Sequence, residues 1–193
     1  NSLGREGSYF TQRTGPTKYR VITSDASIGA VHDFWFKEKD WTIHYVICQQ
    51  SSDKDKPNGD GLILSIDLIT PPDASRRHLP VTIRKQQTVH LSRVDLRHET
   101  AFSIIAENLR VRSIHHIIGY QIQSEHGDQV GKVEDFVVED ADWRIRYLLV
   151  NTQNWLPFKR ILIAPHWLKR ISWEKKRMRA EIPLLVEATG LLP

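Results

Sequence analysis

The chain has 193 residues, of which 40% are hydrophobic and 26% charged, and this balance is ordinary for a soluble globular protein. Its length allows one large domain or two small ones. Cys48 is the single cysteine, which excludes an internal disulfide, and no apolar run approaches the roughly 20 residues that a transmembrane helix requires. We therefore expect a cytoplasmic protein without a transmembrane segment.

The sequence contains the same pattern twice, at a spacing of 102 residues. Residues 28–47 and 130–149 align without a gap and are identical at 8 of 20 positions. The repeat residues expected to carry structure are Gly29 and Gly131, Asp33 and Asp135, Trp41 and Trp143, and Tyr45 and Tyr147. A repeat of this length has the size of a domain and exceeds the roughly 20–50 residues of a solenoid unit. It predicts two similar small domains.

Short strands joined by tight turns follow one another along the chain. Residues 1–17 show no periodicity and predict an irregular leader, residues 18–91 a first domain, residues 92–116 a linker with short helical turns, and residues 117–193 a second domain. The strands expected in the first domain are Tyr19–Thr23, Ala30–Lys37, Trp41–Cys48, residues 61–69 and Val81–Ile83. Those expected in the second are Tyr120–Gln123, Lys132–Glu139, Trp143–Val150, residues 160–168 and Ala180–Ile182. Five or so strands per half favour a small β-barrel or sandwich.

The strand after each Asp-Trp pair alternates apolar and polar residues, which is the period of a half-buried strand. Trp41, Ile43, Tyr45 and Ile47 are expected on the core side, with Trp41 and Trp143 filling the two cores. Towards the strand ends both faces become apolar, at Val46 and Cys48 and at Leu148 and Val150. Both faces of such a strand should be covered. We expect the second face to pack against the other domain in a near two-fold arrangement or, as the alternative, against the short helices.

Residues 117–173 carry several short motifs in one order: a Gly-Tyr strand entry, a glycine turn, "GKVEDFVVED", "WRIRYLLV", "NWLPFK" and "ILIAPHWL". This order resembles the PRC-barrel family, named for the cytoplasmic domain of the photosynthetic reaction-centre H subunit. The first copy matches from Tyr19 to about Ile69 but has "SSDKDKPNGDG" in place of the "NWLP" loop. The resemblance, close to bacterial tandem PRC-barrel proteins, implies an all-β fold of two small antiparallel β-barrels with a few short helices. It also implies a scaffold or adaptor role, since family members include that subunit and the C-terminal domain of a ribosome-maturation factor.

Few residues point to catalysis or to metal binding. Asp33 and Asp135 are kept in both copies, and a buried carboxylate can serve as a base. An Asp at such a position more often accepts backbone N–H groups and fixes a bend. His115 and His116 are adjacent, so on a helix they would point about 100° apart and would not share one metal ion. The sequence predicts no catalytic residues, no metal site and no cofactor, and a small-molecule enzyme is the least favoured function.

Two features of the second half point to partners. The candidate partner-contact residues are Trp155, Leu156, Pro157, Phe158, Lys159 and Arg160, because aromatic residues on a loop are enriched at interface hot spots. The alternative is that Trp155 folds back over the open end of its own barrel. Basic residues also crowd the C-terminal third, from Lys159 to Arg179, although the net charge is only +4. Such a cluster suits RNA or the ribosome, an acidic membrane surface or an acidic protein.

These observations predict a non-enzymatic scaffold or adaptor that mediates protein–protein interaction through tandem PRC-barrels and forms a homo-oligomer, in the first place a dimer. The identity of its protein partner does not follow from the sequence. The alternative is an RNA- or ribosome-associated processing factor that uses the C-terminal basic patch.

Overall fold

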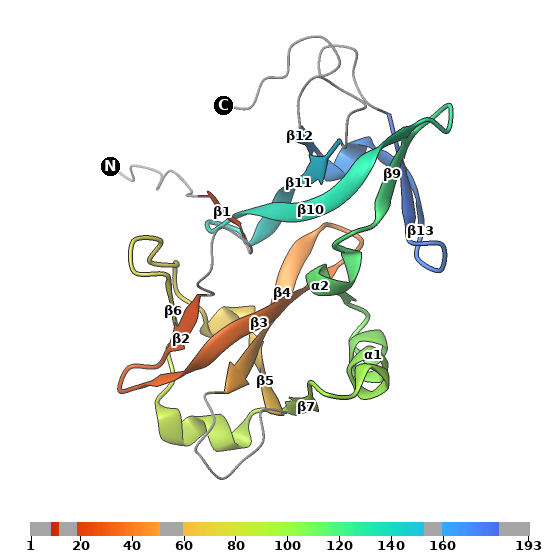
Figure 1. Cartoon of the computed structure of the whole chain (residues 1–193). Helices are drawn as coiled ribbons and strands as arrows, with labels where there is room; N and C mark the ends of the chain where they lie inside the picture. Colours follow the sequence, from red (N-terminus) through yellow and green to blue (C-terminus); the bar gives the residue numbers. More distant parts are fainter. Residues whose placement is uncertain (1–8, 12–18, 51–59, 153–159, 182–193) are drawn as a thin grey trace. The chain divides into compact units, whose positions relative to one another are not determined.

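The computed structural model describes residues 9–11, 19–50, 60–152 and 160–181, and their fold is mostly β with a few short helices (Figure 1). In the first half the strands are β1 (Tyr9–Thr11), β2 (Arg20–Ile22), β3 (Ser27–Lys37), β4 (Thr42–Gln50), β5 (Asp60–Ser65), β6 (His78–Pro80), β7 (Arg93–Asp95) and β8 (Arg112–Ser113). In the second half they are β9 (Gln121–Ser124), β10 (Gln129–Glu139), β11 (Arg144–Asn151), β12 (Arg160–Ile163), β13 (Leu168–Ser172) and β14 (Arg177–Ala180). The helices are α1 (Glu99–Asn108) and α2 (Ile114–Ile117), with 3-10 turns η1 (Ile66–Leu68), η2 (Lys85–His90) and η3 (Pro165–Trp167).

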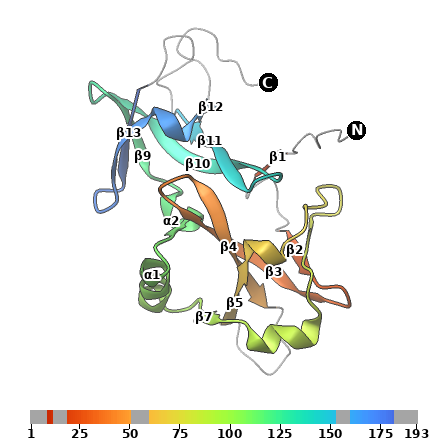
Figure 2. The ribbon, with the colours of Figure 1, turned by 180° about the vertical axis from the view of Figure 1, so that it is seen from behind.

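The chain divides into two compact units. The first comprises Asn1–Ile114 with Glu139–Arg144, and the second comprises His115–Val138 with Ile145–Pro193. In the first unit β3 pairs with β2 and β4, and β5 lies beside β4 in both ribbon views (Figure 2). In the second unit the neighbours run β12, β11, β10, β9, β14 and β13. Among the described residues these pairings leave each sheet open, so closure into barrels stays a prediction.

Corresponding strands of the two units make corresponding pairs. Strand β2 pairs with β6 in parallel, and β9 pairs with β14 in parallel. The bridges Ile69↔Val81 and Asp73↔His78 of the first unit become Leu168↔Ala180 and Ser172↔Arg177 in the second, each shifted by 99 residues. The long strands β3 and β10 begin and end 102 residues apart. The sequence repeat therefore corresponds to matching strand pairs in the two units.

The repeated Asp-Trp pairs form the turns that join β3 to β4 and β10 to β11. The Asp40 carboxylate accepts a hydrogen bond from the backbone N–H of Thr42 at 3.1 Å, and Asp142 does the same for Arg144 at 3.0 Å. The tryptophan between them has a positive φ, 57° at Trp41 and 56° at Trp143. Asp side chains bond to their own backbone two residues on and so fix such turns. The two Asp-Trp pairs therefore fix these turns. As a result, β4 and β11 each begin one residue later than the alternation of apolar and polar residues predicts.

The core placement expected for the two tryptophans is only partly correct. Trp41 is buried and stacks on Phe36 with ring centroids 4.9 Å apart. Trp143 occupies the same turn position but is only half-buried. The last strands are also shifted: β6 and β14 end at Pro80 and Ala180, so most of the predicted Val81–Ile83 and Ala180–Ile182 lies outside them.

Two repeated glycines allow close approach of neighbouring strands. A Cβ on Gly29 would overlap the carbonyl oxygen of Gln49, and one on Gly131 would overlap that of Asn151. Gly29→Ala and Gly131→Ala should each lower the free energy of unfolding by about 1–3 kcal/mol, since a backbone carbonyl cannot yield without moving its strand. Gly61→Ala is the matched control, because its Cβ would meet the Leu96 side chain at 2.9 Å, and a side chain can rotate. Urea unfolding measures all three, and equal losses would contradict the backbone-contact account.

Cys48 is a buried apolar side chain on β4, as the sequence predicts. Burial raises the pKa of its thiol to about 12. Since the thiolate is the reactive form, the folded protein should show negligible labelling by a thiol reagent at pH 8, and full labelling should appear only after unfolding. Rapid labelling of the native chain at pH 8 would contradict this prediction.

Candidate interaction site

Arg160 is the part of the predicted contact loop that the structure describes. Trp155, Leu156, Pro157, Phe158 and Lys159 lie outside the described residues. Arg160 opens β12, and its guanidinium donates two hydrogen bonds to the Glu134 carboxylate of β10, at 2.8 and 2.7 Å. The bond to Glu134 raises the pKa of Arg160. This bidentate pair fixes Arg160 on the sheet at the start of β12.

Apolar side chains lie on the same face of the sheet as Arg160. In the β11–β12 pair, Arg160 is opposite Asn151 and Leu162 is opposite Leu149. Directly opposed residues of an antiparallel pair, and residues two apart on one strand, point to the same side. Tyr147 belongs to this side by the same alternation. We call the side formed by Tyr147, Leu149, Arg160 and Leu162 the β11–β12 face.

The corresponding face of the first unit is covered. Its equivalents of Leu149 and Leu162 are Ile47 and Ile63, which are also directly opposed. They pack in one cluster with Trp35 of β3, with Val94 of β7, and with residues in and just after α1: Ile105, Ala106, Leu109 and Val111. Helix α1 and strand β7 thus form a lid over this part of the first unit, and the predicted linker helix belongs to that unit's core.

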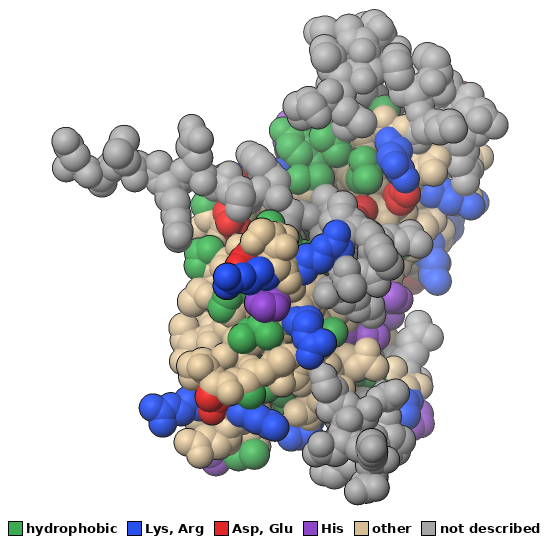
Figure 3. Space-filling model, turned by 60° about the vertical axis from the view of Figure 1, so that its left-hand side comes forward, with side chains coloured by type: hydrophobic (Ala, Val, Ile, Leu, Met, Phe, Trp, Pro, Cys, Tyr) green, Lys and Arg blue, Asp and Glu red, His purple; other side chains and the backbone are tan. Residues whose placement is uncertain are grey.

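The β11–β12 face is more open than its counterpart. Ile47 is 0% exposed and Ile63 8%, whereas Leu149 and Leu162 are half-buried and Tyr147 is 38% exposed. Tyr147 is one of three large hydrophobic residues exposed among the described residues. Hydrophobic side chains gather on the surface of this unit beside basic and acidic ones (Figure 3). Contiguous apolar surface with a charged rim is typical of a protein-interaction site.

The two aspartates of the repeat are buried, and each accepts a hydrogen bond from the backbone N–H of the next residue. Asp33 is 0% exposed and accepts hydrogen bonds from the backbone N–H of Phe34 at 2.8 Å, from Trp35 Nε1 at 3.0 Å and from Ser113 Oγ. Asp135 is 3% exposed and accepts from the backbone N–H of Phe136 at 2.8 Å. The sequence pointed to the backbone bond in each copy, but it gave no sign of the tie between Asp33 and Ser113, which is 80 residues away.

The histidines do not assemble into a site in the described part of the chain. No group of three or more His, Cys, Asp or Glu side chains there could hold a metal ion. His115 and His116 both lie in the one-turn helix α2.

No helix of the described residues is long and apolar enough to cross a membrane.

The second unit thus combines a mostly β fold with a partly exposed apolar face, a combination that is found in protein-interaction modules. Residues 110–183 match the family model of the PRC-barrel domain. The chain is also similar to an uncharacterized protein of Deinococcus radiodurans, with 36% identity over 56 residues. That match covers 29% of this chain and 20% of the relative, so the chain spans only about a fifth of the relative's length.

Proposed function

We propose that the protein is a non-enzymatic scaffold or adaptor built from two PRC-barrel domains, of which the second binds a protein partner through its β11–β12 face. A PRC-barrel domain suits an interaction or scaffold role in general terms. The matching strand pairs and matching glycine contacts support assigning the first unit to the same domain type. The proposal places the protein in the cytoplasm and requires no cofactor.

One observation carries the proposal: helix α1 covers this face in the first unit, whereas the described residues of the second unit contain no equivalent of α1 and Tyr147 is 38% exposed. Exposed Tyr147 beside half-buried Leu149 and Leu162 would gain most from a covering surface, since burying apolar area contributes about 25 cal/mol per Å². Helix α1 and the residue that follows it contribute Ile105, Ala106 and Leu109 to the apolar cluster of the first unit. We expect the partner to present a similar short apolar helix face.

A second copy of the chain is the partner to test first, because a face repeated on identical subunits can pair with itself about a two-fold axis. Sedimentation velocity of the full chain at micromolar concentration should show a dimer. Tyr147→Glu should raise the dimer dissociation constant at least about tenfold, since it puts a charge into an apolar contact.

Ile104→Glu is the matched control, because Ile104 is 54% exposed on α1 and belongs to another surface. It should leave association unchanged. A chain that stays monomeric over the whole concentration range would reject self-association. Equal weakening by both variants would reject the β11–β12 face as its site.

A further inference from the structure

The second unit's sheet also contains strands β13, β14, β9 and β10, and the outer side of these four strands is basic. Two rows of side chains cross strands β13, β14, β9 and β10, as the registers of the three strand pairs show. The first row is Ser172, Arg177, Gln121 and Lys132, and the second is Arg170, Arg179, Gln123 and Gln129. Buried Met178 and Ile122 lie between the rows in sequence and point to the opposite, inner side. We call this outer side the basic face.

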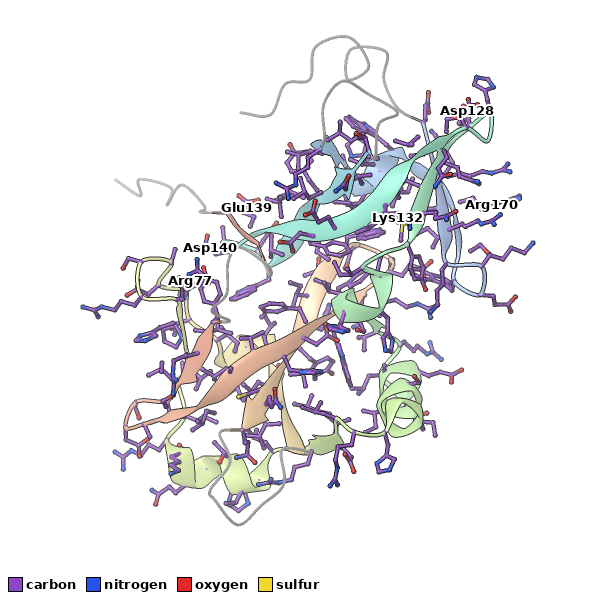
Figure 4. All side chains as sticks on the ribbon, viewed as in Figure 1. Arg77, Asp128, Lys132, Glu139, Asp140 and Arg170 are labelled. Carbon is purple, nitrogen blue, oxygen red and sulfur yellow. The ribbon has the colours of Figure 1, made fainter. Side chains whose placement is uncertain are left out.

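The four cations of the basic face have no acidic partner in the described residues. Arg170, Arg177 and Arg179 are exposed, Lys132 is half-exposed, and none of them forms an ion pair or a side-chain hydrogen bond there. Their neighbour Lys169 differs, since it pairs with Glu181 at 2.6 Å. Figure 4 labels Lys132 and Arg170 on the two outer strands of this group. Among the described residues, the face therefore carries four positive charges without an ion-pair partner, set among glutamine and serine side chains.

One pair within the face is unfavourable for the fold. Arg170 and Arg179 are directly opposed across the β13–β14 pair. Like charges in this position destabilise an antiparallel pair. An anion placed between the two guanidinium groups would remove the repulsion, so the arrangement suits a bound polyanion better than the free protein.

The fold itself does not require these cations. The equivalent positions in the first unit, 99 residues earlier for β13 and β14, are Pro71 for Arg170, His78 for Arg177 and Pro80 for Arg179, and Ala30 stands 102 residues before Lys132. Matching strand pairs form there with these uncharged side chains, His78 being counted as neutral. The cluster of four cations is thus specific to the second unit, and no described residue forms a side-chain bond with any of the four.

We propose that the basic face binds the phosphate backbone of a nucleic-acid duplex. Four strands span roughly 14 Å and the rows are about 7 Å apart, and a duplex carries about one charge per 1.7 Å of its axis, so several phosphates can face the four cations. An arginine guanidinium group binds phosphate oxygens in bidentate fashion, and a glutamine amide donates hydrogen bonds to oxygens of the nucleic-acid backbone.

The composition of the basic face selects this ligand over two others. Single strands are held mainly by stacking of bases on aromatic side chains, and neither row contains an aromatic residue. Surfaces that insert into lipid combine cations with apolar side chains, and neither row contains one. The backbone of a duplex is recognised largely through its charge and its shape.

Fluorescence anisotropy of the full chain with a 20-base-pair labelled RNA duplex and a DNA duplex of the same sequence tests the proposal. The logarithm of the binding constant should fall linearly with the logarithm of the KCl concentration, with a slope of about −3 to −4 for four phosphate contacts. The double variant Arg170→Gln/Arg179→Gln should bind about tenfold or more weakly, and the slope should lose about two units.

Lys39→Gln/Lys85→Gln is the matched control, because it removes the same charge from two exposed lysines of the first unit. It should change neither affinity nor slope by more than a small fraction. Thermal melting of the Arg170/Arg179 variant should be unchanged or higher, since a like-charge pair is removed. The proposal is rejected if neither duplex binds at low salt, if both double variants lose equal affinity, or if only anionic phosphatidylserine vesicles bind.

Discussion

Trp35→Ala should produce the largest loss of stability of any single substitution considered for this chain, about 3–5 kcal/mol in the free energy of unfolding. The Trp35 side chain is 0% exposed on β3, at the centre of the cluster that joins β4, β5 and β7 to α1. Its truncation leaves a cavity that the paired strands cannot fill, and it removes the indole N–H that bonds Asp33 at 3.0 Å. Urea unfolding followed by circular dichroism measures the change.

The repeat supplies a control at the same position of the second unit. Val137 stands 102 residues after Trp35, is half-buried, and lies where the described residues contain no equivalent of α1. Val137→Ala should cost about 1 kcal/mol or less, because few contacts are lost. A loss at Val137 as large as that at Trp35 would show that the second unit's face is covered as fully as the first.

The strands of the fold could be predicted from the sequence because alternation and repetition act locally. Residues 132–139 and 30–37 were expected as strands, and they form most of β10 and β3. The turn conformation of Trp41 and Trp143 was missed, because a tryptophan with positive φ is rare and alternation alone places it on the strand. The Asp40 and Asp142 carboxylates impose that turn.

The surfaces could not be predicted in the same way, because they depend on which elements meet. The sequence indicated both-sided burial near Val46 and Cys48, and both are 0% exposed. It did not indicate that α1 would pack on the Tyr45 and Ile47 side of β4, since that contact joins residues about 60 positions apart. The openness of the β11–β12 face follows only from comparing the two units. Arg160 was expected at a partner contact, but its bond to Glu134 of β10 required the structure.

Asp33→Asn should lower the free energy of unfolding by about 2–3 kcal/mol. The carboxylate accepts from three donors, the Phe34 N–H, Trp35 Nε1 and Ser113 Oγ, and it has no exposed surface. An amide presents an NH2 group to at least one of these donors in either orientation. A buried donor without an acceptor costs about 1–3 kcal/mol, and hydrogen bonds to a charged group contribute about 1.5–3 kcal/mol.

A double-mutant cycle with Ser113→Ala separates the tie between β3 and β8 from the other two bonds. Ser113→Ala alone should cost about 1–2 kcal/mol, and the two substitutions together should cost less than their sum, because they remove the same hydrogen bond.

Asp135→Asn is the corresponding change in the second unit, and there the amide oxygen can still accept the hydrogen bond from the Phe136 N–H. It should lower the thermal midpoint while leaving association through the β11–β12 face intact. Unchanged stability of the Asp135 variant together with lost association would instead make Asp135 a functional acid. In the double-mutant cycle, additive losses would show that Ser113 and Asp33 act independently.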